Sequence, residues 1–262
     1  SSSLLTPVAG SGAILLARSR SQMNAVVALA AGVSLGCMLL VVDGVLADGP
    51  SSWFSGLLYV DALSALLILV VTLVGFASLL YSIDYLGKSG SPHEAAVPRL
   101  RRYYVLLLLF LFTMYLVSEA NNLALLWIGL EGTTLVSALM VGYYQTRRAV
   151  EASWKYLILC SAGLSFALFG TLLLYLASVR ALGTSGSGLD WTSLVAAGGQ
   201  LDPGLMQLAV VFLFVGFATK AGLAPLHTWL PDAHSDGPDP GLRPALRGAA
   251  ELRDVRPPPR RR

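Results

Sequence analysis

Long apolar stretches with almost no charge dominate the sequence and decide which solvent the chain can fold in. They cover residues 24–46, 62–86, 103–118, 121–144 and 154–178, and a sixth stretch begins near Leu205. The hydrocarbon core of a bilayer is about 30 Å thick, which a helix of roughly 20 residues can cross. Inside lipid every backbone polar group needs an internal partner, so each stretch is expected to be a helix. The sequence predicts an all-α, polytopic bundle of about six to seven transmembrane helices.

The composition agrees with a protein that lies in a membrane. Hydrophobic residues make up 55% of the 262 residues and charged residues only 13%, whereas a soluble domain carries about 25% charged residues. Seven of the 18 Lys and Arg residues lie after Pro240, so the basic charge of the chain does not indicate nucleic-acid binding. Cys37 and Cys160 stand alone in apolar stretches, where we expect them to pack as small hydrophobic side chains rather than to form a disulfide or a metal site.

Both ends of the chain depart from this pattern. Residues 4–17 are apolar but too few to span a bilayer, and the first residue is not methionine, so we expect the remainder of a helix there, with a signal-peptide core as the alternative. Residues 1–235 are predicted to form one transmembrane domain. Residues 236–262 are rich in Pro and Arg, and a shifted reading frame of them permits an apolar segment of helical length, so we expect an out-of-frame tail. A basic cytoplasmic tail that binds anionic lipid is the alternative.

The basic residues between the stretches predict the orientation of the chain. Cytoplasmic loops carry an excess of Lys and Arg. Alternate loops hold eight of these residues against one in the others, and the eight are Arg18, Arg20, Lys88, Arg99, Arg101, Arg102, Arg147 and Arg148. The amino end is therefore predicted to lie outside, and residues 227–235 near the cytoplasm. The loop 182–204 is then external, with a short interfacial piece around Trp191.

Three charged side chains fall inside or beside the apolar stretches: Glu131, Lys155 and Lys220. A charge at the centre of a bilayer costs about 2.5 to 3.5 kcal/mol on insertion scales, so such residues tend to face the bundle interior and to mark ion paths. Glu131 is expected to share one helix face with Thr134. Pro225 lacks a backbone donor and is expected to break the sixth helix just after Lys220.

Each of these residues also has a purely structural interpretation. In that interpretation Glu131 bridges two helices, Lys155 extends its ammonium group to the interface, and Lys220 neutralises the carboxyl end of its helix. His227 and His234 are then interfacial side chains bonded to backbone groups that the nearby prolines release. A zinc site built from these histidines lacks the usual spacing and a fourth ligand, so no metal is expected.

Four segments resemble one family of membrane proteins. The segment "ATKAGLAPLHTWLPDAHS" resembles the signature of the proton-conducting antiporter-like membrane subunits shared by respiratory complex I, Mrp-type cation/proton antiporters and energy-converting hydrogenases. The segment "LLWIGLEGTTLVSALMVGYY" is similar to the family's glutamate-bearing fifth helix, and "YVDALSALLILVVTLVGFASLLYS" is similar to its third. The segment "WKYLILCSAGLSFALFGTLLLYLAS" most resembles the subunit of hydrogenase-4-type and formate-hydrogenlyase-type complexes. The resemblance covers about residues 60–235.

The resemblance implies roles for individual residues. Glu131 corresponds to the fifth-helix glutamate, Lys220 to the lysine at the break of the seventh helix, and Lys155 to a sixth-helix basic residue that links toward the glutamate. Burial disfavours a protonated lysine and a nearby carboxylate favours it, so movement of Glu131 relative to Lys220 is expected to switch the lysine between holding and releasing a proton. His227 and His234 join these residues as candidates for proton translocation. The family continues with further helices and a second broken helix, so the chain is expected to be an incomplete, N-terminal half of the family fold.

The expected function is proton translocation as a subunit of a redox-driven complex, either complex I-like or a membrane hydrogenase. An Mrp-type Na+/H+ antiporter subunit and a non-conducting truncated fragment are the alternatives, and the residues leave open whether Na+ replaces H+. The sequence shows no Walker loop, Cys cluster or dinucleotide fingerprint, so we expect no cofactor in this chain and electron transfer in partner subunits. The expected partners are other membrane and peripheral subunits and the lipid bilayer, with no nucleic acid. The expected location is the inner membrane of a prokaryotic cell.

Overall fold

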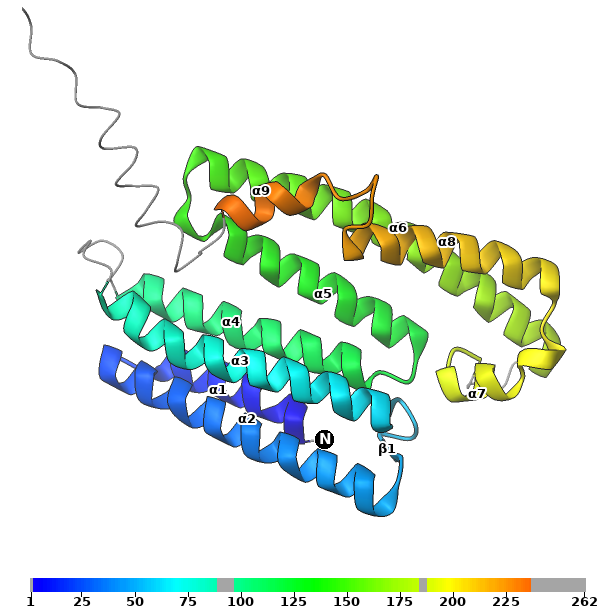
Figure 1. Ribbon diagram of the computed structural model, residues 1–262, viewed down its shortest axis with the longest axis horizontal. Helices are drawn as coiled ribbons and strands as arrows, with labels where there is room; N and C mark the ends of the chain where they lie inside the picture. The colour runs from blue at the N-terminus through cyan, green and yellow to red at the C-terminus, as the bar shows by residue number, and fades with distance from the viewer. Residues whose placement is uncertain (1, 89–96, 184–187, 237–262) are drawn as a thin grey trace, which may run out of the picture.

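The computed structural model describes residues 2–88, 97–183 and 188–236, and helices dominate this part of the chain (Figure 1). The helices are α1 (Ser2–Leu16), α2 (Arg20–Asp48), α3 (Ala62–Lys88), α4 (Val97–Glu119), α5 (Leu123–Val141), α6 (Arg147–Leu182), α7 (Trp191–Ala196), α8 (Pro203–Ala221) and α9 (Trp229–Asp236). Two strands, β1 (Ser51–Trp53) and β2 (Leu58–Val60), and two 3-10 turns, Gly142–Tyr144 and Gly198–Gln200, lie between them. Residues 237–262 of the predicted out-of-frame tail lie outside the described residues, whereas its first residue, Asp236, is the last residue of α9.

The predicted transmembrane helices are confirmed. Within the described residues, six helices are long and apolar enough to cross a membrane, and they cover Arg20–Asp48, Ala62–Asp84, Val97–Glu119, Leu123–Tyr144, Arg147–Ala181 and Pro203–Ala221. The apolar segment at the amino end forms the shorter helix α1. Large apolar side chains such as Leu29, Leu67 and Phe214 are exposed on the helix surfaces, where lipid is their natural solvent. The chain is a multi-pass integral membrane protein.

Figure 1 shows the helices in two groups that lie side by side. In the first group α1 packs against α2 and α4, and α2 packs against α3. In the second group α6 and α8 share the most extensive contact of any two helices, and α5 lies between α4 and α6. The polar residues predicted for the site come from α5, α6 and the region of α8 and α9. The second group therefore positions the site.

A small β-hairpin between α2 and α3 is the element that the all-α prediction omits. β1 and β2 pair antiparallel, and residues 54–56 in their turn have positive φ. Strands of three residues carry too little alternation of polar and apolar side chains to be recognised in a sequence. The hairpin lies at the predicted outer end of the bundle. The predicted interfacial piece at the same end is the short helix α7.

Asn121 joins three of the segments at this predicted outer end. Its side-chain amide donates to the Gly56 carbonyl oxygen at 2.8 Å and to Thr192 Oγ1 at 3.1 Å. Its backbone N–H donates to the Leu57 carbonyl oxygen at 2.9 Å. Asn121 is buried, and the next residue, Asn122, caps α5 through its side chain. The hairpin, α7 and the start of α5 are thereby tied together.

Glycines bring the backbones of α6 and α8 into direct contact. A Cβ atom added to Gly216 would lie 2.5 Å from Ala167 Cβ and 2.8 Å from the Gly163 carbonyl oxygen. A Cβ atom added to Gly163 would lie 2.5 Å from the Thr219 side chain. Small residues allow membrane helices to approach this closely. Because Thr219 immediately precedes Lys220, this contact fixes the position of the Lys220 backbone relative to α6.

A glycine, rather than the proline named in the sequence prediction, ends α8. Gly222 adopts the left-handed conformation with φ 72° and ψ 33°, and its N–H donates to the Thr219 carbonyl oxygen at 3.2 Å. A left-handed glycine of this kind is a common helix end. The predicted break between Lys220 and Pro225 is confirmed, and Pro225 follows in the link that leads to α9.

Gly216→Ala should lower the thermal stability of the protein in detergent. The added methyl group meets backbone atoms of α6 that cannot rotate away, and overpacking of this kind costs about 1 to 3 kcal/mol. Gly36→Ala in α2 is the matched control, because nothing lies within 4 Å of the added Cβ atom. Thermal unfolding of both purified variants is the measurement. An unchanged Tm for Gly216→Ala would contradict the close contact of α6 with α8.

Candidate functional site

Lys220 lies in the last turn of α8 and places its ammonium group against α5 and α6. Nζ donates to Thr134 Oγ1 at 2.6 Å on α5 and to the Tyr156 hydroxyl at 3.1 Å on α6. Nζ also lies 5.4 Å from the centre of the Tyr156 ring, within the range of a cation–π contact. None of the described acidic side chains forms an ion pair with Lys220. Neutral hydroxyl groups and an aromatic ring therefore take the place of water around this charge.

Glu131 lies on α5, one turn before Thr134. Its Oε1 accepts a hydrogen bond from Ser161 Oγ of α6 at 2.5 Å. Its Oε2 is buried and has no hydrogen-bond partner among the described residues. The carboxylate forms no direct ion pair with Lys220. A buried oxygen without a partner is costly, so Oε2 is the atom of this site that is open to a further hydrogen-bond donor.

α5 carries glycines on the side that packs against α4 and polar groups on the side that meets α6 and α8. A Cβ atom added to Gly129 would lie 2.8 Å from Val117 Cγ2 of α4. Gly132 is similarly close to α4, where an added Cβ atom would lie 3.1 Å from the Thr113 side chain. The close approach to α4 fixes the rotation of α5 about its axis. This rotation directs Glu131 toward α6, as the hydrogen bond from Ser161 shows.

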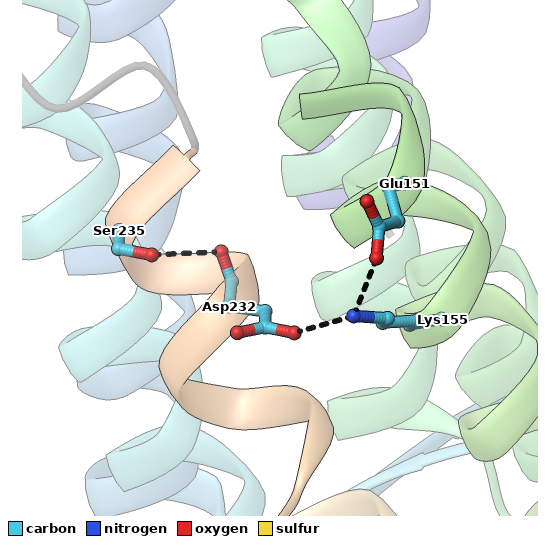
Figure 2. Close-up of polar contacts among 4 residues, drawn as sticks. All are labelled: Glu151, Lys155, Asp232 and Ser235. Atoms are coloured by element: carbon cyan, nitrogen blue, oxygen red, sulfur yellow. Dashed lines mark hydrogen bonds and ion pairs between the residues drawn. The ribbon is translucent and has the colours of Figure 1, made fainter. Parts of the chain in front are cut away.

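Lys155 belongs to a separate cluster of charges near the start of α6 (Figure 2). Its Nζ lies 2.8 Å from Glu151 Oε1, one turn earlier on α6, and 3.3 Å from Asp232 Oδ2 on α9. The three side chains are about half exposed, at 50%, 65% and 46% respectively. Ser235 Oγ donates to the Asp232 carbonyl oxygen at 3.3 Å and completes the cluster. The structure brings Lys155 to α9 rather than to Glu131.

His227 and His234 are exposed on either side of Trp229. His234 Nδ1 lies 2.9 Å from the Leu230 carbonyl oxygen, and the His227 carbonyl oxygen accepts the Leu230 N–H at 3.0 Å. These bonds to backbone groups fit the interfacial interpretation of the two histidines. The part of the chain that the structure describes contains no group of three or more His, Cys, Asp or Glu side chains that could hold a metal ion.

Trp229 attaches α9 to the end of α8 and to α6. The side chain is buried, and its Nε1 donates to the Thr219 carbonyl oxygen at 3.0 Å. Carbonyl groups in the last turn of a helix lack intrahelical donors, so this bond satisfies one of them. The Trp229 ring packs against the Tyr156 ring with 4.8 Å between their centres. α9 is therefore held next to the hydroxyl group that binds Lys220.

Tyr156, Ser161 and Trp229 are the residues of the site that the sequence analysis misses. Tyr156 and Ser161 lie in the apolar stretch that begins with Trp154 and Lys155. In that stretch the charge of Lys155 stands out more than a neutral hydroxyl group does. A buried hydroxyl group in lipid also needs a partner. Hydroxyl-bearing side chains within an apolar stretch are therefore the sequence signal that points to such contacts.

Two family profiles match the chain. The profile described as "NADH:quinone oxidoreductase/Mrp antiporter, TM" covers residues 120–242, and the profile described as "NADH-Ubiquinone oxidoreductase (complex I), chain 5 N-terminus" covers residues 52–104. The chain belongs to the proton antiporter-like membrane subunit family. The first range includes α5 to α9 and thus every residue of the site described above. The resemblance read from the sequence is confirmed.

Curated relatives of this antiporter-like subunit include a hydrogenase component and a quinone oxidoreductase subunit. The "Hydrogenase-4 component F homolog" of Methylacidiphilum infernorum (isolate V4) is 39% identical over 193 residues, which cover 74% of this chain and 40% of the relative. The "NADH-quinone oxidoreductase subunit N" of Halorhodospira halophila (strain DSM 244 / SL1) is 31% identical over 189 residues, which cover 71% of this chain and 36% of the relative. The chain thus spans about two fifths of the length of these relatives.

Solved structures share the fold of this antiporter-like subunit. A chain of the membrane-bound sulfane sulfur reductase, an archaeal respiratory membrane complex, superposes with a TM-score of 0.73 at 24% identity, over 91% of this chain and 47% of that chain. A chain of respiratory complex I from Thermus thermophilus with bound aureothin superposes with a TM-score of 0.68 at 26% identity, over 91% of this chain and 48% of that chain. The described helices therefore have the arrangement found in about half of each solved chain.

Trp229→Phe should loosen α9, whereas Asp232→Asn should have little effect. Phenylalanine keeps a ring against Tyr156 but removes one of the two donors to the Thr219 carbonyl oxygen, which still accepts from the Gly222 N–H, so the loss is about 0.5 to 1.5 kcal/mol. The exposed Lys155–Asp232 pair contributes only about 0 to 1 kcal/mol. Hydrogen exchange of the α9 amides, followed by mass spectrometry, is the measurement. Faster exchange in Asp232→Asn than in Trp229→Phe would contradict this order.

Proposed function

We propose that this antiporter-like subunit translocates protons across the membrane within a redox-driven complex, with Glu131 and Lys220 as the groups that bind and release the proton. The observation that carries the proposal is the ammonium group of Lys220, which is held by the hydroxyl groups of Thr134 and Tyr156 without a carboxylate in contact. Ionisable residues within a membrane mark proton relays and ion paths. Transporters also place ion sites at the breaks of discontinuous helices, and Lys220 lies at such a break.

In this proposal the proton occupancy of Lys220 depends on the position of Glu131. Removal from water disfavours the protonated form of a lysine, and a nearby carboxylate favours it. In the structure the Glu131 carboxylate is bonded to Ser161 and does not touch Lys220. A move of the carboxylate toward Lys220 would load the lysine with a proton, and its return to Ser161 would release the proton.

We assign Lys155, His227 and His234 to the surface that supplies protons to this pair. All three side chains are exposed, and the excess of basic residues in alternate loops predicts that this end of the bundle faces the cytoplasm. A histidine changes its charge between about pH 5 and 8 and can exchange protons with water there. Their proposed role is to exchange protons with the cytoplasm, whereas Glu131 and Lys220 act within the membrane.

The relatives favour a redox-driven complex over an independent antiporter. The two curated relatives described above are named as a hydrogenase component and as a quinone oxidoreductase subunit. We propose that partner subunits perform the electron transfer and that this chain contributes to the proton path. Both relatives are bacterial, which supports a place in the inner membrane of a prokaryotic cell. An Mrp-type Na+/H+ antiporter subunit is the alternative, because the matching family description also includes Mrp antiporters.

Glu131→Gln and Lys220→Ala should abolish redox-driven proton pumping and leave assembly nearly intact. Glutamine keeps the size of the glutamate but cannot take up a proton. Lys220→Arg should fail as well, because the guanidinium group stays protonated. The measurement is proton uptake into membrane vesicles that contain the assembled complex with the full-length chain, followed with a pH-sensitive dye and divided by the rate of the redox reaction.

Asp48→Asn is the matched control for these variants, because Asp48 is exposed at the end of α2 and far in sequence from the site. It should pump at the rate of the unchanged protein. Full pumping in Lys220→Arg would show that Lys220 is a structural charge. Unchanged pumping in Glu131→Gln would remove Glu131 from the mechanism. Proton movement driven by a Na+ gradient without redox substrate would instead support the Mrp-type alternative.

A further inference from the structure

We propose that the hydroxyl group of Tyr156 relays protons between Lys220 and the cytoplasmic side of the membrane through Ser137. The inference rests on the proposed function, because it takes Lys220 as the group that carries the proton. It adds to the path two neutral side chains that neither charge nor sequence position singles out. Tyr156 is thereby a positioning and relay residue for the proton of Lys220.

The hydrogen bonds that start at Lys220 form a chain with a single direction. Lys220 Nζ donates to the Tyr156 oxygen at 3.1 Å, so the hydroxyl proton of Tyr156 is left for another acceptor. Ser137 Oγ lies 2.8 Å from the Tyr156 hydroxyl. Ser137 itself donates to the Thr133 carbonyl oxygen at 2.5 Å, so Tyr156 is the donor in the bond between the two hydroxyl groups. Each hydroxyl group thus accepts one hydrogen bond and donates one.

The other acceptor of Lys220 does not continue such a chain. Thr134 Oγ1 accepts from Lys220 at 2.6 Å and donates to the Leu130 carbonyl oxygen at 3.0 Å. This bond ends on a backbone carbonyl of the same helix, whereas the Tyr156 hydroxyl is bonded to the further hydroxyl group of Ser137. Thr134 therefore holds the ammonium group, and Tyr156 connects it to the next hydroxyl group.

Ser137 brings the chain of hydroxyl groups close to the predicted cytoplasmic end of α5. The helix ends at Val141, about 6 Å further along its axis. Ser153 Oγ of α6 lies in the same region, where it donates to the Ala138 carbonyl oxygen at 2.7 Å. An added Cβ atom on Gly142 would lie 3.3 Å from the same Ser153 oxygen. Ser153 thus places a further hydroxyl group beside the last turn of α5, and the proposal takes water as the proton carrier beyond Ser137.

Packing fixes the position of the Tyr156 hydroxyl. The Tyr156 side chain is only 6% exposed and lies in a cluster of buried residues with Ala138, Cys160 and Trp229. The Trp229 ring covers it with 4.8 Å between the ring centres. A relay needs its groups held close to the geometry of transfer. The packing meets this need and holds the hydroxyl group within reach of Lys220 Nζ.

The release of one proton from Lys220 along these hydroxyl groups is balanced in atoms and in charge. Nζ transfers a proton to the Tyr156 oxygen while the Tyr156 hydroxyl proton moves to Ser137 Oγ. In this step the Ser137 hydroxyl turns away from the Thr133 carbonyl oxygen and passes its proton to a water molecule at the cytoplasmic end. Each oxygen gains one proton and loses one, Lys220 becomes neutral, and the water carries the positive charge. Uptake of a proton from the cytoplasm is the reverse of these steps.

Tyr156→Phe tests the relay, because it removes the hydroxyl group and keeps a ring that packs against Trp229. In vesicles that contain the assembled complex with the full-length chain, we expect redox-driven pumping to fall about tenfold or more, the loss expected for one hydrogen bond to a charged group. The ratio of pumping rates in H2O and D2O should rise, because proton transfer from Lys220 becomes the slowest step. Tyr175→Phe is the matched control on α6, with a side chain 44% exposed, and should change neither quantity.

Ser137→Ala is the second variant and should lower pumping and raise the isotope ratio in the same direction. If the complex with Tyr156→Phe does not assemble, the pumping rate and the isotope ratio of Ser137→Ala test the relay. Normal pumping, or slower pumping with an unchanged isotope ratio, would overturn the relay in favour of a packing role. Lys220→Ala in the same preparation separates the two proposals. If Lys220→Ala pumps normally, the proposed function fails, whereas an inactive Lys220→Ala beside a normal Tyr156→Phe removes only the relay.

Discussion

An ammonium group inside a bilayer needs other atoms in place of its water, and the site around Lys220 depends on this requirement. The replacing atoms are the hydroxyl oxygens of Thr134 and Tyr156, which belong to two different helices. α5 and α6 must therefore keep fixed positions relative to the end of α8. Neutral acceptors stabilise a cation less than a carboxylate does. The lysine is thus held in place without a direct ion pair with Glu131, which would oppose the proton release proposed for it.

α6 provides the frame on which the other parts of the site meet. Within a few turns it offers the hydroxyl of Tyr156 to Lys220, that of Ser161 to Glu131, and the bare backbone at Gly163 to α8. Its first turns also hold α9, through the ring contact of Tyr156 and the ion pair of Lys155. One helix therefore links the contacts of the Lys220 ammonium group, of the Glu131 carboxylate and of α8 with α9.

Features that follow from a local sequence pattern are predicted well. Features that depend on how the helices pack against one another are not. The spans follow from apolar length, and Glu131 and Lys220 stand out because a charge in such a stretch is costly. The rotation of one helix against another is not written in a local pattern. The pairing of Tyr156 with Lys220, and the contact of Lys155 with α9 in place of Glu131, depend on that rotation. The choice of Gly222 over Pro225 as the helix end likewise depends on a backbone conformation that several nearby residues could have supplied.

The backbone contact between α6 and α8 has a mechanical consequence. Where Gly216 meets the Gly163 carbonyl oxygen and the Ala167 methyl group, no side chain has another rotamer in which to repack, so this contact has little room to adjust. The two helices are therefore expected to move together as one rigid unit. The more flexible part is the link that begins at Gly222, where α8 ends and the chain turns. A force from a neighbouring protein on these two helices would thus bend the chain at this link, beside Lys220.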